Sequence, residues 1–394
     1  MDILKDKTIL LGITGGISAY KVPDIASKLC QYGANVDVVM TESAAKFITP
    51  LTLQSITGRQ VFTDMWQPVA GFKAAHVALA ETADVILIAP ATANTIAKLA
   101  CGLADDMLSC AVLATKAPVI ISPAMNDNML NNAVTQKNIS KLKDRGFVII
   151  ESGYGHLLSG KVGQGRLPET AEIIDIIKLV LARGGDFSGK RIVITAGGTK
   201  EAIDPVRFIG NRSSGKMGFA IAQAARDRGA DVTLITTVPL KPSAGMEVVN
   251  VESAREMKKA VEDAVVGADV LIMAAAVADY QAEKSSGSKI KKNGDVLELK
   301  LIKTPDILSE IKGNFIKVGF AAESENIIEN ALTKMKEKGL HLIVANDITA
   351  TDGGFGADTN RVIIIDRKEV PEELPLLTKR EAADRILDRI KEIL

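Results

Sequence analysis

The chain has 394 residues, and its 48 lysines and arginines balance its 48 aspartates and glutamates. This length is too great for one ordinary hydrophobic core and predicts two domains, while the zero net charge provides no overall field to attract nucleic acid or an anionic membrane. No run approaches the roughly 20 apolar residues that a membrane span needs. The three cysteines, Cys30, Cys101 and Cys110, form no close-spaced metal-binding pair, and the chain does not start like a secretory signal. We therefore expect a soluble cytoplasmic protein that binds neither nucleic acid nor membranes.

The same three landmarks occur in each half of the chain. In the first half, a strand ends in a paired-glycine turn, and two further strands follow, at residues 9–16 (ILLGITGG), 33–40 (GANVDVVM) and 83–90 (ADVILIAP). The second half repeats this order at residues 192–198 (IVITAGG), 229–236 (GADVTLIT) and 268–275 (ADVLIMAA). Because helix-like stretches separate these strands, the pattern predicts an α/β fold of two doubly wound, mainly parallel Rossmann-like domains in tandem.

A linker is predicted where the apolar helix-like stretch 172–181 gives way to the segment ARGGDFSG. We expect domains at 1–183 and 190–394, joined by residues 184–189. In the second domain, the basic segment 284–294 (KSSGSKIKKNG) lacks apolar periodicity and is predicted to be a mobile loop. Two helices are also expected there, an amphipathic one at 324–339 and a covering one at 379–394.

Both glycine turns are candidate phosphate sites, because a strand that turns tightly into a helix leaves free backbone N–H groups and a positive helix end at one spot. Neither turn has the full G-x-G-x-x-G spacing, so a nicotinamide enzyme is the weaker interpretation. Around the first turn, hydroxyls suited to a terminal phosphate belong to Thr14, Ser18, Thr41 and Ser43. For each of them, ordinary helix capping is the alternative.

Two polar residues in the first half lie next to predicted strands. His76 occurs in an alanine-rich helical stretch (AAHVALAE), where a lone histidine is more often structural, and Asn126 follows a strand in the run SPAMN, where it can cap a helix. Between them, the segment APATAN (89–94) follows a buried strand, and its small residues would let a flat ring approach the backbone.

The order of glycine turn, histidine, APATAN, PAMN and a glycine-rich loop ending in GRLPE resembles the flavin-containing cysteine decarboxylases, in particular the phosphopantothenoylcysteine decarboxylases. The resemblance covers roughly the first 180 residues. It implies an oxidative decarboxylation on FMN, with His76 as the catalytic histidine and Asn126 binding the substrate carboxylate. It also implies FMN contacts at Gly15, Gly16, Ser18, Thr41, Pro90, Ala91, Thr92 and Asn94.

One residue departs from that family. Where its members commonly have Ala-Cys-Gly before GRLPE, this chain has Leu158-Ser159-Gly160. The family cysteine is the expected proton donor in the final reduction, and a serine hydroxyl is far less acidic than a thiol. Either another group donates the proton or the last step is slow, and nothing in the sequence assigns that role to Cys101 or Cys110.

The second half carries the motifs AGGT, IDPVR, NRSSGKMG, AAAVADY, KIKK and GFAAE in this order, which resembles phosphopantothenate-cysteine ligase over nearly its whole length. The resemblance implies that CTP and Mg²⁺ activate the carboxylate of 4'-phosphopantothenate as an acyl-cytidylate, which the amine of cysteine then attacks. Asn211 would handle the acyl-cytidylate, Lys289 the triphosphate, and Asp279 the nucleotide and its metal. The implied nucleotide contacts are Ala275, Asp279, Lys289, Pro305, Asp306, Ile307, Leu308, Phe320, Lys334 and Lys338.

The lysines also have alternative interpretations that involve no ligand binding. Lys289, Lys291 and Lys292 can be a solvated charge run, and Lys334 and Lys338, one helical turn apart, can be exposed surface lysines without a binding role.

The two resemblances together predict a bifunctional coenzyme A biosynthesis enzyme acting on small molecules. They also imply a homo-oligomer of decarboxylase trimers and ligase dimers, a combination that can build a dodecamer. The rival interpretations are a non-enzymatic flavoprotein for the first half and a nicotinamide oxidoreductase.

Overall fold

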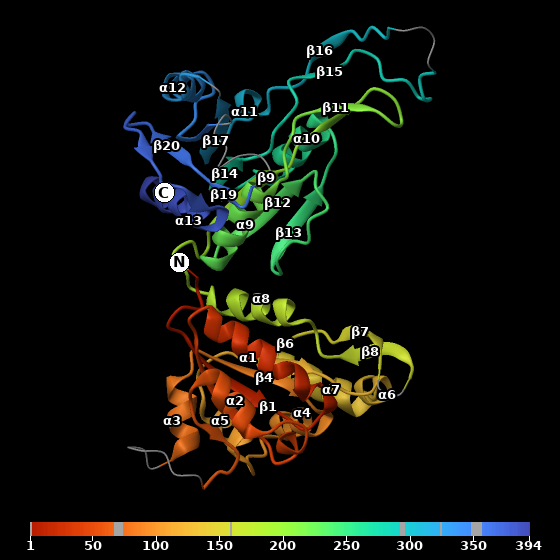
Figure 1. Ribbon diagram of the computed structural model, residues 1–394, viewed down its shortest axis with the longest axis vertical. Coiled ribbons are helices and arrows are strands. Elements are labelled where there is room, and N and C mark those ends of the chain that lie inside the picture. The colour runs from red at the N-terminus through yellow and green to blue at the C-terminus, as the bar shows by residue number, and fades with distance from the viewer. Residues whose placement is uncertain (1, 67–73, 158–159, 292–295, 324, 348–356) are drawn as a thin grey trace. The chain divides into compact units, whose positions relative to one another are not determined.

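The computed structural model describes residues 2–66, 74–157, 160–291, 296–323, 325–347 and 357–394. These residues form two compact units, 2–181 and 182–394 (Figure 1). Each unit is a sheet with helices on both faces, as the alternation of elements predicts. Among the helices in the described part of the chain, none combines the length and apolar character that a membrane crossing requires.

The first unit contains a six-stranded parallel sheet. Its strands lie in the order β3 (Val61–Phe62), β2 (Asn35–Met40), β1 (Thr8–Ile13), β4 (Val85–Ala91), β5 (Val119–Pro123) and β6 (Val148–Ile149). A separate hairpin pairs β7 (Gly153–His156) with β8 (Val162–Arg166). The helices are η1 (Ile17–Lys21), α1 (Val22–Gln31), η2 (Ala44–Lys46), α2 (Pro50–Thr57), α3 (Ala75–Thr82), α4 (Ala93–Cys101), α5 (Met107–Ala114), α6 (Asp127–Leu130), α7 (Ala133–Asp144) and α8 (Thr170–Leu181).

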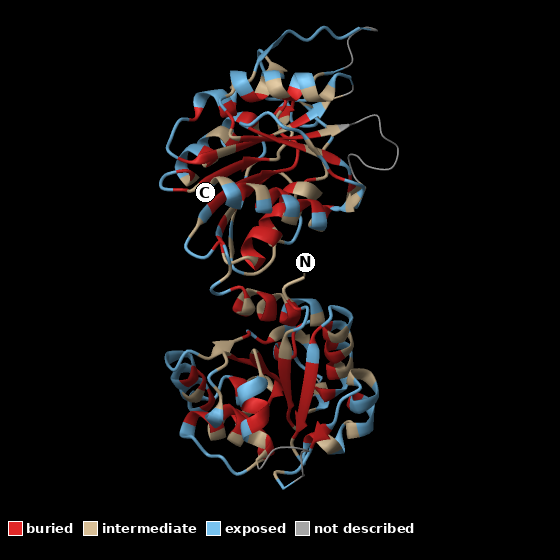
Figure 2. Ribbon diagram, turned by 90° about the vertical axis from the view of Figure 1, so that its left-hand side faces the viewer, coloured by how far each residue is buried: buried red, intermediate tan, exposed pale blue. Residues whose placement is uncertain are grey.

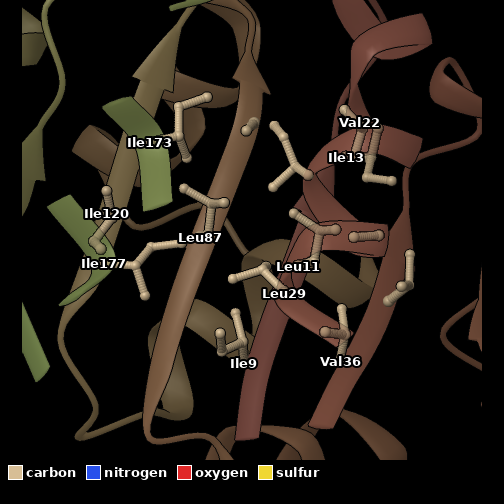
Figure 3. Packing of buried hydrophobic residues seen from close by; sticks show 14 of the residues in the cluster. Ile9, Leu11, Ile13, Val22, Leu29, Val36, Leu87, Ile120, Ile173 and Ile177 are labelled. Atoms are coloured by element: carbon tan, nitrogen blue, oxygen red, sulfur yellow. The ribbon is translucent and has the colours of Figure 1, made fainter. Parts of the chain in front are cut away.

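Both faces of this sheet are buried, which explains why its strands are continuous apolar runs. On one face, alternate residues Ile9 and Leu11 of β1 pack with Leu87 of β4 against α1 and α8, as Figure 3 shows. Leu10 and Ile86 belong to the core on the opposite face, under α3, α4, α5 and α7. The buried strands appear between partly exposed helices in Figure 2.

The second unit contains an eight-stranded sheet. Its order is β13 (Met246–Asn250), β12 (Asp231–Thr236), β9 (Arg191–Ala196), β14 (Val270–Met273), β17 (Ile316–Glu323), β18 (Leu342–Asp347), β20 (Val362–Asp366) and β21 (Glu372–Glu373). The strands from β13 to β18 are parallel, whereas β20 and β21 are antiparallel to their neighbours. Three short antiparallel pairs complete the strands: β10 (Lys200–Ala202) with β11 (Phe208–Gly210), β15 (Tyr280–Ala282) with β16 (Leu301–Lys303), and β19 (Thr359–Asn360) with β22 (Leu377–Thr378).

Helices cover the two faces of this sheet with separate cores. One core contains residues of α9 (Lys216–Asp227) and α13 (Lys379–Ile393), and the other contains residues of α10 (Ala254–Ala264), α11 (Ile307–Glu310) and α12 (Ile327–Glu337). The predicted doubly wound fold and both predicted helices of this half are confirmed, with α12 shorter at each end than the expected 324–339. The described part of the basic segment 284–294 lies between β15 and β16.

Candidate active sites

The order of strands in the first sheet identifies where a ligand would bind. The chain proceeds outward from β1 to β2 and β3 on one side, and from β4 to β5 and β6 on the other. In open parallel sheets, the crevice at such a reversal, outside the carboxyl ends of the strands, is the usual ligand site. Gly15, Gly16 and Ser18 follow β1, Thr41 follows β2, and residues 90–94 end β4 and begin α4. The structure therefore brings all the predicted FMN contacts to one edge of the sheet.

A buried threonine joins the two strands at this crevice. The hydroxyl of Thr14 donates to the carbonyl of Pro90 at 2.6 Å and accepts from the backbone N–H of Thr92 at 3.1 Å. Beside it, a Cβ on Gly15 would lie 2.3 Å from the Cβ of Ser43, so the loops after β1 and β2 meet too closely for any larger residue. The backbone at this edge is thus held in place by contacts between the two loops and the end of β4.

Two hydroxyls at this edge accept from nearby backbone N–H groups: that of Thr92, a predicted FMN contact, and that of Thr41, one of the four around the first turn. Thr92 accepts from the N–H of Thr95 at 3.3 Å as the N-cap of α4, and Thr41 accepts from the N–H of Ala44 at 3.2 Å. An accepting hydroxyl keeps its own O–H for donation. Small residues, the start of α4 and the glycine cradle at Gly15 together fit a flat ring with a phosphate.

The motifs APATAN, PAMN and GRLPE are hydrogen-bonded to one another. The N–H of Ala124 donates to the carbonyl of Ala91 at 3.1 Å, and the N–H of Met125 donates to Gly165 in β8 at 3.0 Å. Asn126 caps α6, since its side-chain oxygen accepts from the N–H of Asn128 at 3.0 Å. Its amide N–H groups are therefore the donors it can offer to a carboxylate.

His76 is the second residue of α3 and is half-buried. Because α3 returns to the sheet to begin β4, its first turn lies toward the carboxyl edge of the strands.

Leu158 and Ser159 lie outside the described residues. Cys101 ends α4, eight residues beyond Ala93 and so roughly 12 Å along the helix from its start at 1.5 Å per residue. Burial raises the pKa of the Cys110 thiol, which donates to the carbonyl of Ala104 at 3.3 Å.

In the second unit, a cleft of about 830 Å³ opens at the corresponding reversal, between β9 and β14. Asn211 and nine of the ten predicted nucleotide contacts line it, namely Ala275, Asp279, Pro305, Asp306, Ile307, Leu308, Phe320, Lys334 and Lys338. The exception is Lys289, which is exposed in the loop between β15 and β16 and is not among the lining residues. For Lys289, the solvated alternative therefore stays open.

Two lysines of α12 mark one end of this cleft. Lys334 donates to the carbonyl of Phe320 at 3.0 Å, and Lys338 donates to the carboxylate of Asp306 at 3.1 Å. Burial, and secondly the charge of Lys338, lowers the pKa of Lys334. Burial alone would raise the pKa of Asp306, but hydrogen bonds from Ser309 and Lys338 hold it below its ordinary value. Neither lysine is simple surface decoration, because each has a specific partner in the cleft wall.

The middle of the cleft is formed by backbone groups. Asn211 donates its side-chain N–H to the carbonyl of Val277 at 2.9 Å, and the N–H of Ala275 donates to Thr195 at 3.1 Å. Helix α9 starts directly behind these residues and packs on β9. A Cβ on Gly218 would lie 2.6 Å from the Cβ of Ala196, so glycine is required for this close approach.

Asp279 contributes an exposed carboxylate to the cleft. Within the described ranges, no group of three or more histidine, cysteine, aspartate or glutamate side chains could hold a metal ion. Mg²⁺ in nucleotide sites is commonly held by one or two carboxylates plus the phosphates of the substrate, so a single aspartate fits a metal that arrives with a nucleotide.

The sequence prediction missed several polar residues that line the cleft. Lys216 lies inside the quoted motif NRSSGKMG, but nothing distinguished it from a common loop lysine. Asn346, Asn360 and Lys379 come from β18, β19 and α13, and no sequence motif links them. Only the folded chain brings them together.

Comparisons with known proteins agree with both halves. The Flavoprotein family model matches residues 2–182, and the model of the DNA/pantothenate metabolism flavoprotein C-terminal domain matches residues 187–394. The coenzyme A biosynthesis bifunctional protein CoaBC of Bacillus subtilis (strain 168) is 44% identical over 395 residues, covering 98% of this chain and 97% of that protein. The protein of the same name from Escherichia coli (strain K12) is 42% identical, with coverage of 98% and 97%.

A solved structure is similar to part of this chain. The crystal structure of the C-terminal domain of coenzyme A biosynthesis bifunctional protein CoaBC is 41% identical and covers 53% of this chain and 97% of that chain, with a TM-score of 0.46. With two family models spanning both units and relatives above 40% identity along its full length, the chain belongs to the family of coenzyme A biosynthesis bifunctional proteins.

Proposed function

We propose that this protein carries out two steps of coenzyme A biosynthesis. Its second domain, residues 190–394, joins 4'-phosphopantothenate to cysteine with CTP, and its first domain, residues 1–183, decarboxylates the product to 4'-phosphopantetheine. Residues 184–189 link the two. The observation that carries the proposal is the cleft in the second unit, because chain segments as distant as Asn211 and Lys338 line it together.

In the ligase cleft, Lys334 and Lys338 donate to the acceptor atoms of cytosine, and Asp306 orients Lys338. The substrate carboxylate attacks the α-phosphorus of CTP and pyrophosphate leaves. The cysteine amine then attacks the acyl carbon, and CMP leaves with the electron pair of the broken bond. Asn211 holds the acyl-cytidylate by its amide. Asp279 would hold Mg²⁺, which would supply neutralising charge for this chemistry.

In the decarboxylase crevice, FMN is held by Gly15, Gly16, Ser18, Thr41 and the segment Pro90, Ala91, Thr92 and Asn94. When bound, FMN supplies a reversible acceptor for two electrons and a proton. His76 moves a proton at the cysteine moiety of the substrate, and Asn126 orients its carboxylate through N–H donors without a full counter-charge. Ser159 replaces a thiol with a much weaker acid, so we expect the final protonation to limit the rate.

The assembly and the location are part of the same proposal. We expect a cytoplasmic homo-oligomer, built from trimers of the decarboxylase domain and dimers of the ligase domain, which together can form a dodecamer. Sedimentation of the full chain measures this directly, and a monomer at assay concentrations contradicts it.

The function is tested with 4'-phosphopantothenate, cysteine, CTP and Mg²⁺ and mass identification of the products. We expect CMP, pyrophosphate and 4'-phosphopantetheine from a yellow protein. Accumulation of phosphopantothenoylcysteine contradicts the decarboxylase assignment but leaves the ligase intact, whereas absence of pyrophosphate release contradicts the ligase.

A matched pair of lysines on α12 tests the nucleotide assignment. Lys338→Gln should weaken CTP binding about tenfold, because it removes a charge-assisted contact. Lys336→Gln is the control, since Lys336 pairs with Glu369 at 2.9 Å and is not a lining residue. Equal effects of the two changes contradict a cytosine site at Lys338.

A further inference from the structure

The β7–β8 hairpin of the first unit packs on α6 through glycines (Figure 1). Gly163 and Gly165 of β8 are buried, and the backbone N–H of Met125 donates to the carbonyl of Gly165 at 3.0 Å. Residues without side chains let one backbone approach another closely, so the hairpin lies directly against residues 125–127. On this face, the polar groups that a ligand could use come from the few side chains that border the glycines.

Two oppositely charged side chains border them. A Cβ on Gly163 would lie 3.4 Å from Oδ2 of Asp127, and a Cβ on Gly155 would lie 2.7 Å from Nη1 of Arg166. Gly155 and Gly163 are directly opposite each other in the hairpin. Opposite residues of an antiparallel pair point to the same face, with Cβ positions about 4.5–5.5 Å apart. The carboxylate and the guanidinium therefore lie on one face of the hairpin, within about 12 Å of each other.

Neither charged group has a partner in the described part of the chain. Oδ1 of Asp127 is buried and accepts no hydrogen bond. Arg166 is half-buried, yet among the described residues its guanidinium donates no hydrogen bond and forms no ion pair. Buried polar atoms without partners are rare in folded chains, and a guanidinium carries five N–H donors. An acceptor and a set of donors that share a face without bonding to each other fit an occupant that offers both a donor and an acceptor.

The substrate of the proposed decarboxylation carries such a group beside its reacting carbon. The α-carbon of its cysteine moiety bears the carboxylate and also the nitrogen of the amide that joins it to the pantothenoyl chain. This amide has one N–H donor and one C=O acceptor. Asn126 is proposed to hold the carboxylate, and Asp127 is the next residue. A phosphate fits the pair less well, because the carboxylate of Asp127 would repel it.

We propose that Asp127 and Arg166 bind the amide of the acylated cysteine. The carboxylate of Asp127 accepts from the amide N–H, and the guanidinium of Arg166 donates to the amide C=O. This inference rests on the proposed decarboxylase function. Both contacts are charge-assisted hydrogen bonds, which are stronger than those between neutral groups. They hold the α-carbon in place beside Asn126, and they favour acylated cysteine over free cysteine, which offers no acyl C=O to Arg166.

The test measures binding to the full chain loaded with FMN by the change in flavin absorbance, which reports on the first unit. The probe is an analogue of phosphopantothenoylcysteine in which a hydroxyl replaces the reacting thiol, and a second analogue also has an ester oxygen in place of the amide N–H. The wild-type chain should bind the amide about tenfold more tightly than the ester.

The variants separate the two contacts. Asp127→Ala should weaken binding of the amide about tenfold and leave the ester within twofold, because the ester has no N–H to donate. Arg166→Met should weaken both about tenfold, since both keep the C=O. Glu151→Gln and Lys161→Gln are the controls, because these exposed residues lie next to the same hairpin, and each should leave both affinities within twofold. Retained FMN affinity shows that each variant is folded.

Three outcomes overturn the proposal. Equal losses for amide and ester in Asp127→Ala mean that the carboxylate supports the hairpin and does not bind the N–H. A loss in Arg166→Met that disappears when the analogues lack their phosphate assigns Arg166 to the phosphate. Unchanged affinities in both variants mean that the pair does not touch the substrate. A wild-type chain that binds FMN but neither analogue instead overturns the decarboxylase function itself, which distinguishes the two failures.

Discussion

Replacing Thr14 by valine should weaken both the first unit and its affinity for FMN. Thr14 is 1% exposed, and its hydroxyl connects the end of β1 to the end of β4 through Pro90 and Thr92. Valine has nearly the same shape, so the change creates no cavity, but it leaves a buried carbonyl and a half-buried N–H without partners. At about 1–3 kcal/mol for each of the two unpartnered groups, we expect a loss of about 2–6 kcal/mol in local stability. We also expect about tenfold weaker FMN binding, because Thr92 at the start of α4 loses its hydrogen bond to residue 14.

Hydrogen exchange of β1 and β4 amides in the full chain measures the first effect, and fluorescence titration of FMN measures the second. Thr82→Val is the matched control, since the hydroxyl of Thr82 donates to the carbonyl of Ala78 within its own helix, at 2.9 Å, on an exposed residue. The control should change stability by less than about 1 kcal/mol. If the two valine variants show the same amide exchange rates in β1 and β4 and the same affinity for FMN, the hydrogen bonds of Thr14 do not position the FMN site.

Three further changes test the second unit. Asp227→Ala should destabilise it by about 3–5 kcal/mol in denaturant-dependent exchange, because the buried carboxylate contacts Arg380 at 2.6 Å and its loss leaves the guanidinium without this counter-charge. Since burial lowers the pKa of Lys334 below the ordinary 10.5, its charge is complete at low pH and is lost earlier on the alkaline side than for an exposed lysine. The Kd for CTP should therefore rise with pH below 10.5, and Lys334→Gln should abolish that rise. Asp204→Asn should speed amide exchange around Lys289 and slow the ligase without changing CMP affinity, because the Asp204 carboxylate accepts from the backbone of this loop at 3.2 Å.

The repeated landmarks in the sequence predicted the fold well, because strands buried on both faces must be apolar throughout. The predicted strand at 83–90 is β4, and the one at 268–275 contains β14. The turns that follow β1 and β9 are where the order of each sheet reverses. The paired-glycine turn, a local signal in the sequence, thus marks the point where the strand order of the whole sheet reverses.

The site was predictable where a motif keeps its residues close together in the chain. Residues 305–308 and the pair Lys334 and Lys338 form one cleft wall, as their motifs imply. The position of Lys289 was not predictable in this way, because it depends on a loop whose backbone, at Ile290, donates a hydrogen bond to the distant Asp204. Asn360 and Lys379 carried no signal, because a single asparagine or lysine in a polar stretch looks the same whether it faces solvent or a cleft.

The order of apolar runs, glycine turns and motif residues in the sequence determined the two α/β units and the family. Those features are local, and each follows from the period of a strand or helix and from the backbone freedom of glycine. Only the tertiary structure decided which side chains share a cleft, which hydroxyls act as caps, and which carboxylate oxygen is buried without a partner. These properties depend on contacts between segments tens to hundreds of residues apart, and a linear pattern does not specify such contacts.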